Sequence, residues 1–385
     1  MRYFITVCVA FWTMASCWLY AGEAPVATTV DGGQFVVRER LNLLSLIGDA
    51  TTLGRQGGEL VAPQTQAMIT LLGLHPGLIG QGQAPIAQEK LDGVPERYRQ
   101  EIDAWAKAAH CDPLFLLRAN MSVDVLCTAV VREPDVNNNR PLIIARNMDF
   151  APAQWLGPQT VVIARRPTGR RANVSVSWPG YVGVVSGMND AGVVACLLLN
   201  HAAKANRTGD GLGFRLRDIL EQAGDMNEAI NLFSAAPIAS SNYVLLADAT
   251  TAAIVWWEAD AVRRVDPTMG WLLCTNAQLE DATQRPIDQR GRHALSLMEK
   301  ALNPDVDWMK RLLSATYMPH INTQAMIFIP SSRSLQLAIY GPRPAALSTY
   351  KTIDVAALLT GAQLAEYPVL LQPAVDKPFP HYVNE

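Results

Sequence analysis

A cysteine, an arginine and an aspartate lie close together in a part of the chain made of short apolar runs. Cys127 opens the run Cys127–Val131, and Arg146 and Asp149 follow the next run, Pro141–Ala145. If the two runs pair as a hairpin, Arg146 and Asp149 return beside Cys127. A thiol between a cation and a carboxylate can have its proton controlled, as nucleophilic catalysis requires. The spacing leaves open a buried structural cysteine beside an ordinary Arg–Asp ion pair.

The elements that would hold these side chains are short strands between groups of helices. Apolar and β-branched runs bounded by turn residues predict strands, and apolar residues at helical spacing predict helices. The predicted strands are 127–131, 141–145, 160–164, 173–178, 182–186, 193–199, 243–247, 252–258, 271–275, 325–329 and 335–339. The predicted helices are 60–72, 94–110, 114–117, 214–233, 290–302 and 307–315. Grouped helices and strands of this kind predict an α+β fold.

The overall composition excludes several functional classes. Lys and Arg number 32 and Asp and Glu 35, for a net charge of −3, and basic residues form only short pairs such as Arg165-Arg166. A nucleic-acid partner would need a basic surface, so we expect none. Six cysteines in 385 residues are too few for a disulfide scaffold. No Cys-x-x-Cys pair occurs and the six histidines lie far apart, so the sequence indicates no structural zinc site.

The first 24 residues differ from the rest of the chain. Arg2 precedes an apolar run, 3–21, which ends at 22–25. The pattern predicts a signal peptide at 1–24 and therefore an exported protein, periplasmic or extracellular. The run is also long enough to span a bilayer, so a membrane anchor through this segment is the alternative, and lipidation of Cys17 is a lesser one.

Short motifs occur at several points along the chain: Cys127-Thr128, 145–150, 180–183, 186–193, Leu199-Asn200, 242–248 and Thr275-Asn276. Together they resemble the N-terminal-nucleophile (Ntn) hydrolases that use a cysteine. This superfamily includes the penicillin acyltransferases, the choloylglycine hydrolases, and the acid ceramidases with their N-acylethanolamine-hydrolysing relatives. Upstream, 48–58 resembles the propeptide of the acyltransferase branch. The order and spacing of these short motifs make the resemblance specific.

The resemblance implies a four-layer αββα sandwich in a precursor that cuts itself between Leu126 and Cys127. A mainly helical propeptide, 25–126, would remain as a non-covalent α chain. The catalytic β chain would be 127–385. Leu126 is bulkier than the glycine often found before the cysteine in this superfamily.

The resemblance also implies a role for each residue of the site. Cleavage gives Cys127 a free α-amine, with a reference pKa of about 7.7–8.0, which can take the proton of its own thiol. Arg146 would keep the thiol in a positive environment, and Asp149 would hold the α-amine. His201, the histidine nearest to the motif residues in sequence, is the alternative base.

The remaining implied roles concern the oxyanion and the substrate. The side chain of Asn276 and the backbone N–H of Asn200 would donate to the oxyanion. A second arginine of the site would be Arg290, with Arg292 as the other choice of register. Four aromatic residues are candidates either for an acyl pocket or for the plain core: Trp178, Tyr181, Trp256 and Trp257.

We therefore expect a self-processing cysteine amidohydrolase that cleaves a linear C–N amide bond of a small N-acyl substrate through a thioester. An acyltransferase that passes the acyl group to an amine is the first alternative. A catalytically inactive exported binding protein is the alternative from another class. No metal or organic cofactor is implied.

Overall fold

The computed structural model describes residues 27–74, 91–121, 125–200, 211–238, 240–258, 261–277 and 288–384. The predicted signal peptide, 1–24, and His201 lie outside these residues. None of the described helices is long and apolar enough to cross a membrane.

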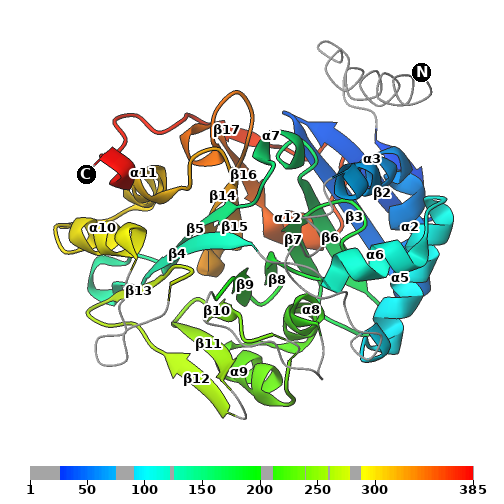
Figure 1. Cartoon of the computed structure of the whole chain (residues 1–385), viewed down its shortest axis with the longest axis horizontal. Coiled ribbons are helices and arrows are strands. Elements are labelled where there is room, and N and C mark those ends of the chain that lie inside the picture. Colours follow the sequence, from blue (N-terminus) through cyan, green and yellow to red (C-terminus); the bar gives the residue numbers. More distant parts are fainter. Residues whose placement is uncertain are drawn as a thin grey trace.

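Two large sheets form the centre of the described structure (Figure 1). The first contains, in spatial order, β1 (Thr28–Val30), β2 (Gly33–Arg38), β3 (Leu41–Gly48), β6 (Val161–Pro167), β7 (Asn173–Ser177), β8 (Ser186–Asn189), β9 (Val194–Leu198), β10 (Tyr243–Ala247), β11 (Ala252–Glu258) and β12 (Ala261–Val265). The second contains β13 (Trp271–Cys274), β4 (Leu126–Arg132), β5 (Ile143–Asp149), β14 (Asn322–Ile329), β15 (Ser334–Ile339), β16 (Tyr350–Asp354) and β17 (Leu370–Gln372). We call them the ten-stranded and the seven-stranded sheet.

Helices cover the outer sides of both sheets. Those of the N-terminal segment are α2 (Ala50–Leu60), α3 (Ala62–Leu74), α5 (Glu96–Ala108) and α6 (Pro113–Met121). Those after Cys127 are α7 (Ala153–Leu156), α8 (Leu212–Gln222), α9 (Met226–Ser234), α10 (Gln289–Met298), α11 (Val306–Thr316) and α12 (Val355–Leu359). In Figure 1, α10 and α11 lie at one side of the molecule and α2, α5 and α6 at the other.

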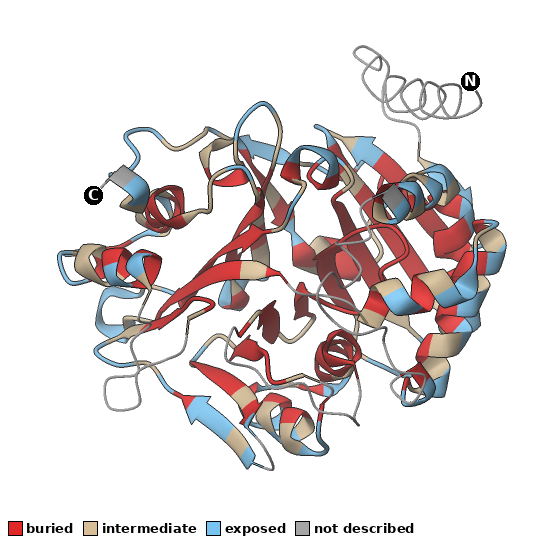
Figure 2. Ribbon diagram, in the orientation of Figure 1, coloured by how far each residue is buried: buried red, intermediate tan, exposed pale blue. Residues whose placement is uncertain are grey.

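Alternate residues of one strand enter different hydrophobic clusters, which defines the layers. On β4, Cys127, Ala129 and Val131 belong to the cluster that also holds the inner residues of the ten-stranded sheet. Val130, between them, packs with residues of α10 and α11. On β3, Leu43 joins the first cluster and Leu44 packs with α5. Because alternate side chains of each strand face opposite sides of its sheet, each sheet packs against the other sheet on one side and against helices on the other, which is the predicted α+β fold with αββα layers. The strands between the helices are largely buried (Figure 2).

The N-terminal segment begins differently from the sequence-based prediction. Instead of being helical from its start, its described part opens with β1, β2 and β3, which pair through two-residue turns at Asp31-Gly32 and Glu39-Arg40. β3 then pairs in parallel with β6. The segment expected to be a mainly helical propeptide therefore also supplies three strands to the ten-stranded sheet.

Most predicted elements after Cys127 are present, with three differences. The predicted helix 214–233 is two helices, because Ala223 and Gly224 leave the helix and Asp225 caps the next one. The predicted strand 182–186 is wrong: this stretch is irregular up to Ser186, where β8 begins. The sequence did not predict α7, β12, β16, β17 or α12.

Glycines on α2 allow a close approach to α5. A methyl group at Gly57 would lie 2.2 Å from a ring carbon of Trp105, which is fully buried. We expect Gly57→Ala to lower the free energy of unfolding by about 1–3 kcal/mol, although alanine is the better helix former, because the rigid indole must move. Urea unfolding measures the change.

Gly73, on α3, is the matched control. Nothing lies within 4 Å of a methyl group placed there. Gly73→Ala should leave the stability unchanged or raise it by up to about 1 kcal/mol. Equal effects of the two substitutions would contradict the close packing of α2 on α5.

Candidate active site

The predicted hairpin of β4 and β5 is confirmed. In its register Leu126 faces Asp149, Cys127 faces Met148 and Ala129 faces Arg146. The guanidinium nitrogen Nη2 of Arg146 donates to the Cys127 thiol sulfur at 3.1 Å. The hairpin thus brings Cys127, Arg146 and Asp149 together.

Arg146 is held from the opposite sheet. Its Nη1 donates at 2.7 Å to the carbonyl oxygen of Val185 and at 2.7 Å to the hydroxyl of Ser186. Its Nη2 also donates to the carbonyl oxygen of Leu197. Arg146 has no solvent-exposed surface. A full positive charge is therefore fixed between the sheets and directed at the thiol.

The Cys127 thiol is completely buried in the uncut chain. Burial raises the pKa of the Cys127 thiol to about 11, and the charge of Arg146 acts in the opposite direction. Sγ lies 3.4 Å from the carbonyl oxygen of Val125 and 3.6 Å from that of Leu197. The thiol is thus protonated at neutral pH, and a base must remove its proton before it can act as a nucleophile.

Asn276 binds the backbone of Cys127. It follows β13, and its Oδ1 accepts from the Cys127 N–H at 2.7 Å and from Nη2 of Arg290 at 2.8 Å. Its Nδ2 donates to the carbonyl oxygen of Leu199 at 2.8 Å. Asn276 is therefore at the site, and in the uncut chain it holds the nitrogen of the Leu126–Cys127 bond.

Asp149 is buried and has several partners. Its Oδ2 lies 3.3 Å from Nη1 of Arg290, and its Oδ1 accepts from Asn322 at 2.8 Å and from the backbone N–H of Met318 at 3.3 Å. Burial raises the pKa of Asp149 to about 6, against the opposing effects of Arg290 and the hydrogen bonds. Sequence reasoning missed Asn322. The local signal is that three polar residues, Asn322-Thr323-Gln324, begin an otherwise apolar strand, which indicates a buried polar position.

Arg290 and Arg292 differ in burial and in their contacts. Arg290 is 6% exposed and contacts both Asp149 and Asn276. Arg292, two residues further on α10, is exposed. The N-cap of the helix, Asp288, accepts from the Gly291 N–H at 2.7 Å and fixes this rotation. The structure therefore brings Arg290, and not Arg292, to Asp149 and Asn276, and the catalytic role of Arg290 stays a prediction.

Asn200 lies near the site but is bound elsewhere. Its backbone N–H donates to Oδ1 of Asn242 at 3.1 Å, and its Nδ2 donates to the carbonyl oxygen of Ser241 at 3.1 Å. The neighbouring Leu199 makes the link to the site, through Asn276 and through its N–H, which donates to Val125 at 3.1 Å. The oxyanion role of Asn200 stays a prediction.

The four aromatic candidates fall into two groups. Trp178 donates to the carbonyl oxygen of Leu156 at 3.0 Å, and both Trp178 and Tyr181 are buried in the cluster that contains Cys127. Trp257 donates to the carbonyl oxygen of Phe233 on α9 at 3.3 Å, and Trp256 packs edge-on against Tyr243. The contacts of Trp256 and Trp257 are those of core residues. An acyl-pocket role of any of the four stays a prediction.

A family model supports the same assignment. Residues 136–326 match the family of acyl-coenzyme A:6-aminopenicillanic acid acyl-transferase. The matched stretch contains Arg146, Asp149, Asn276 and Arg290, which the structure brings together. The chain belongs to the Ntn hydrolase superfamily.

Other similar proteins give more distant matches. An uncharacterized protein of Archaeoglobus fulgidus is 25% identical over 232 residues, which cover 49% of this chain and 38% of that protein. This Ntn hydrolase chain therefore spans well under two thirds of the curated relative that it matches.

Among solved structures, the chain resembles a Caenorhabditis elegans ortholog of N-acylethanolamine-hydrolyzing acid amidase, with 19% identity and a TM-score of 0.43, over 53% of this chain and 93% of that one. It also resembles penicillin V acylase from Agrobacterium tumefaciens, with 14% identity and a TM-score of 0.36, over 66% and 99%. A mutant conjugated bile acid hydrolase from Clostridium perfringens matches with 10% identity and a TM-score of 0.41, over 64% and 96%.

In the described part of this chain, no group of three or more His, Cys, Asp or Glu side chains could hold a metal ion.

The raised pKa of Asp149 predicts a pH dependence of stability. The folded chain binds the Asp149 proton more tightly than the unfolded chain, whose reference pKa is 3.8. Between about pH 4 and 6 the unfolded state therefore loses this proton first, and this residue's contribution to the free energy of unfolding falls as the pH rises. Asp149→Asn removes that fall.

The measurement is urea unfolding of Cys127→Ala and of Cys127→Ala with Asp149→Asn, from pH 4 to 7.5, so that both chains stay uncut. The stability of the double variant relative to the single one should increase through this window. A difference that is constant with pH would show that the carboxyl of Asp149 titrates at its ordinary value.

Proposed function

We propose that this Ntn hydrolase is a self-processing cysteine amidohydrolase that cleaves the C–N bond of a linear N-acyl compound through a thioester at Cys127. The observation that carries the proposal is the buried contact of the Arg146 guanidinium with the Cys127 sulfur at 3.1 Å. At the same cysteine, Asn276 Oδ1 accepts from the backbone N–H of Cys127 and from Nη2 of Arg290. The family match of residues 136–326 supports the same chemistry.

The first step would be self-cleavage. The Cys127 thiol adds to the carbonyl carbon of Leu126, the C–N bond to Cys127 breaks, and the nitrogen takes up a proton. A thioester joins Leu126 to Sγ until water hydrolyses it to a carboxylate and a free thiol. The hydrogen bond between Asn276 and the departing nitrogen supports this step.

The freed α-amine would then serve as the base in turnover. Its reference pKa is about 7.7–8.0, so a fraction is neutral at pH 7 and can take the thiol proton. The nearby charge of Arg146 favours the neutral amine, and Asp149 favours the protonated one. The thiolate attacks the substrate carbonyl carbon, the amine proton goes to the leaving nitrogen, and water resolves the thioester. Asn276 and the N–H of Asn200 would donate to the oxyanion.

The closed site of the uncut chain supports a precursor. Cys127 has no exposed surface, and Val125 accepts the N–H of Leu199, so the segment before Cys127 lies along the end of β9. Cleavage would free this segment and open the thiol to substrate. The N-terminal segment, 25–126, would remain bound as the α chain, and 127–385 would be the catalytic chain. The residues at 1–24 would direct export.

An acyltransferase is the second candidate, because the matched family model is that of an acyl-transferase. The two differ only in what resolves the thioester, water or an amine. Adding an amine acceptor to the reaction and measuring the ratio of free acid to new amide separates them. An inactive binding protein, the third alternative, would not need Asn276 and Arg290 bound together at Cys127.

Self-cleavage predicts two polypeptides. Purified protein should separate in a denaturing gel into two chains, and the larger should begin with Cys127 by N-terminal sequencing and intact mass. Cys127→Ala should give one chain. Wild-type protein that is active as one uncut chain would contradict the α-amine mechanism.

The two arginines of α10 provide a matched pair for turnover. Arg290→Ala leaves the buried Asp149 and Asn276 without their cation, so kcat/KM should fall by about two to three orders of magnitude, as for the loss of one oxyanion-stabilising donor. Arg292→Ala, on the exposed side of the helix, should keep turnover within about twofold. Equal losses in both variants would remove Arg290 from the site.

A further inference from the structure

The stretch from Gly180 to Val185 connects the N-terminal segment to the active site. It lies between β7 and β8, is buried and has no regular secondary structure. We call it the 180–185 loop. A buried loop must satisfy its backbone polar groups through other parts of the protein, so the partners of these groups determine its shape.

Asn120 is the side chain that binds this loop most extensively. Its Nδ2 donates to the carbonyl oxygen of Gly180 at 2.9 Å, and its Oδ1 accepts from the N–H groups of Val182 at 2.7 Å and Gly183 at 3.2 Å. Asn120 is 3% exposed and lies on α6, before the proposed cleavage site. One amide of the N-terminal segment thus fixes three backbone groups of the catalytic segment.

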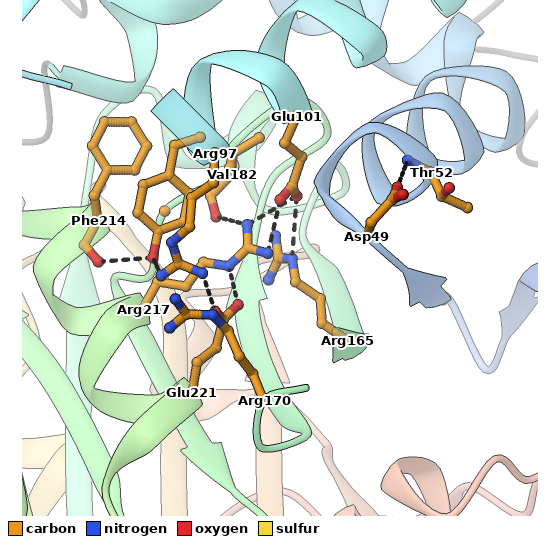
Figure 3. A network of polar contacts seen from close by, with 12 residues as sticks. Asp49, Thr52, Arg97, Glu101, Arg165, Arg170, Val182, Phe214, Arg217 and Glu221 are labelled. Atoms are coloured by element: carbon orange, nitrogen blue, oxygen red, sulfur yellow. Dashed lines mark hydrogen bonds and ion pairs between the residues drawn. The ribbon is translucent and has the colours of Figure 1, made fainter. Parts of the chain in front are cut away.

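A buried network of charges holds the next carbonyl groups of the loop (Figure 3). Glu101 on α5 binds Arg217 on α8 at 2.8 Å and lies 3.9 Å from Arg165 on β6. Arg217 Nη1 donates to the carbonyl oxygen of Val182 at 2.9 Å, and Arg165 Nη2 donates to that of Tyr181 at 3.2 Å. Glu101, also from the N-terminal segment, therefore lies between the two cations that hold the loop.

The other end of the loop contacts the catalytic arginine. The carbonyl oxygen of Val185 accepts from Arg146 Nη1 at 2.7 Å and from the N–H of Leu197 at 2.9 Å. Arg146 in turn donates to the Cys127 sulfur. The two ends of the loop are therefore held by different residues: Asn120 binds it at Gly180, Val182 and Gly183, and Arg146, which faces the Cys127 sulfur, binds it at Val185.

We infer that Asn120 is a positioning residue for the reaction, acting on Cys127 through the 180–185 loop and Arg146. The inference rests on the proposed function, since it concerns the same nucleophile after self-cleavage. It assigns to the separated N-terminal chain a continuing part in turnover. If the α chain only closed the active site of the precursor, it could dissociate after cleavage. If it holds the 180–185 loop, it must stay bound so that Arg146 remains in contact with the Cys127 thiol.

The test compares Asn120→Ala with Asn120→Asp and Thr65→Val. Asn120→Asp keeps the acceptor for Val182 and Gly183 but loses the bond to Gly180. Thr65 is the control: it is fully buried in the same segment and accepts from the indole N–H of Trp105 at 3.1 Å, so its loss removes a buried hydrogen bond within the N-terminal chain. Intact mass first shows whether each protein is cut into two chains.

The main readout is the alkylation rate of Cys127 by iodoacetamide against pH, on the two-chain protein, with the modified peptide identified by mass. We expect Asn120→Ala to shift the apparent pKa of this reaction upward and to lower turnover by about tenfold to a hundredfold, the effect of a misplaced catalytic group. Asn120→Asp should fall between Asn120→Ala and wild type. Thr65→Val should keep the wild-type pH profile, even if its stability is lower.

The outcomes separate the two proposals. Wild-type protein that is never cut would contradict the self-processing function and this inference with it. If Asn120→Ala is cut into two chains and keeps the pH profile and the turnover of the wild type, the positioning role is wrong and the proposed function is unaffected. If Asn120→Ala does not fold, the same comparison is made on Asn120→Asp, and an unchanged profile there overturns the inference equally.

Discussion

The structure depends most on one buried positive charge, the guanidinium of Arg146. A charge without exposed surface has lost its hydration, and this loss is large unless hydrogen bonds replace the water. Here the replacement comes from Ser186 and Leu197 of the ten-stranded sheet and from Val185 in the adjoining 180–185 loop. The arginine itself belongs to the seven-stranded sheet. The same charge that opposes the effect of burial on the thiol therefore also fixes how the two sheets face one another.

The proposed cleavage site does not coincide with a boundary between two parts of the fold. The bond before Cys127 lies within β4, yet the residues before it supply three strands of the ten-stranded sheet. The parallel pairing of β3 with β6 joins the two segments over seven residue pairs. Removing the N-terminal segment would expose that edge and leave Arg165 and Arg217 without Glu101. Self-cleavage would thus change what Cys127 can do without dividing the core.

The sequence predicted those features that depend on local pattern. The β4–β5 hairpin follows from two apolar runs around a polar turn, and its register places Arg146 beside Cys127 as expected. The spacing of apolar residues likewise predicted the α5 helix. The strands β1 to β3 were missed even though Asp31-Gly32 is a strong hairpin signal. The next turn, Glu39-Arg40, uses residues that rarely adopt a positive φ, so its pattern looks like an ordinary charged surface.

What the sequence could not predict depends on contacts between distant segments. Asn322 binds Asp149 across 173 residues of chain, and Asn120 binds the 180–185 loop across 60 or more. Apart from the polar start of the strand at Asn322, nothing local distinguishes either asparagine from a turn or surface residue. The role of an amide becomes clear only when burial forces its hydrogen-bonding atoms to find partners. The predicted strand at 182–186 failed for the same reason. Its valines are apolar enough for a strand, but the backbone groups of residues 182–184 bind Asn120, Arg217 and Gly213 instead of a neighbouring strand. A stretch whose sequence predicts a strand is therefore bent into the loop that binds Arg146 through Val185.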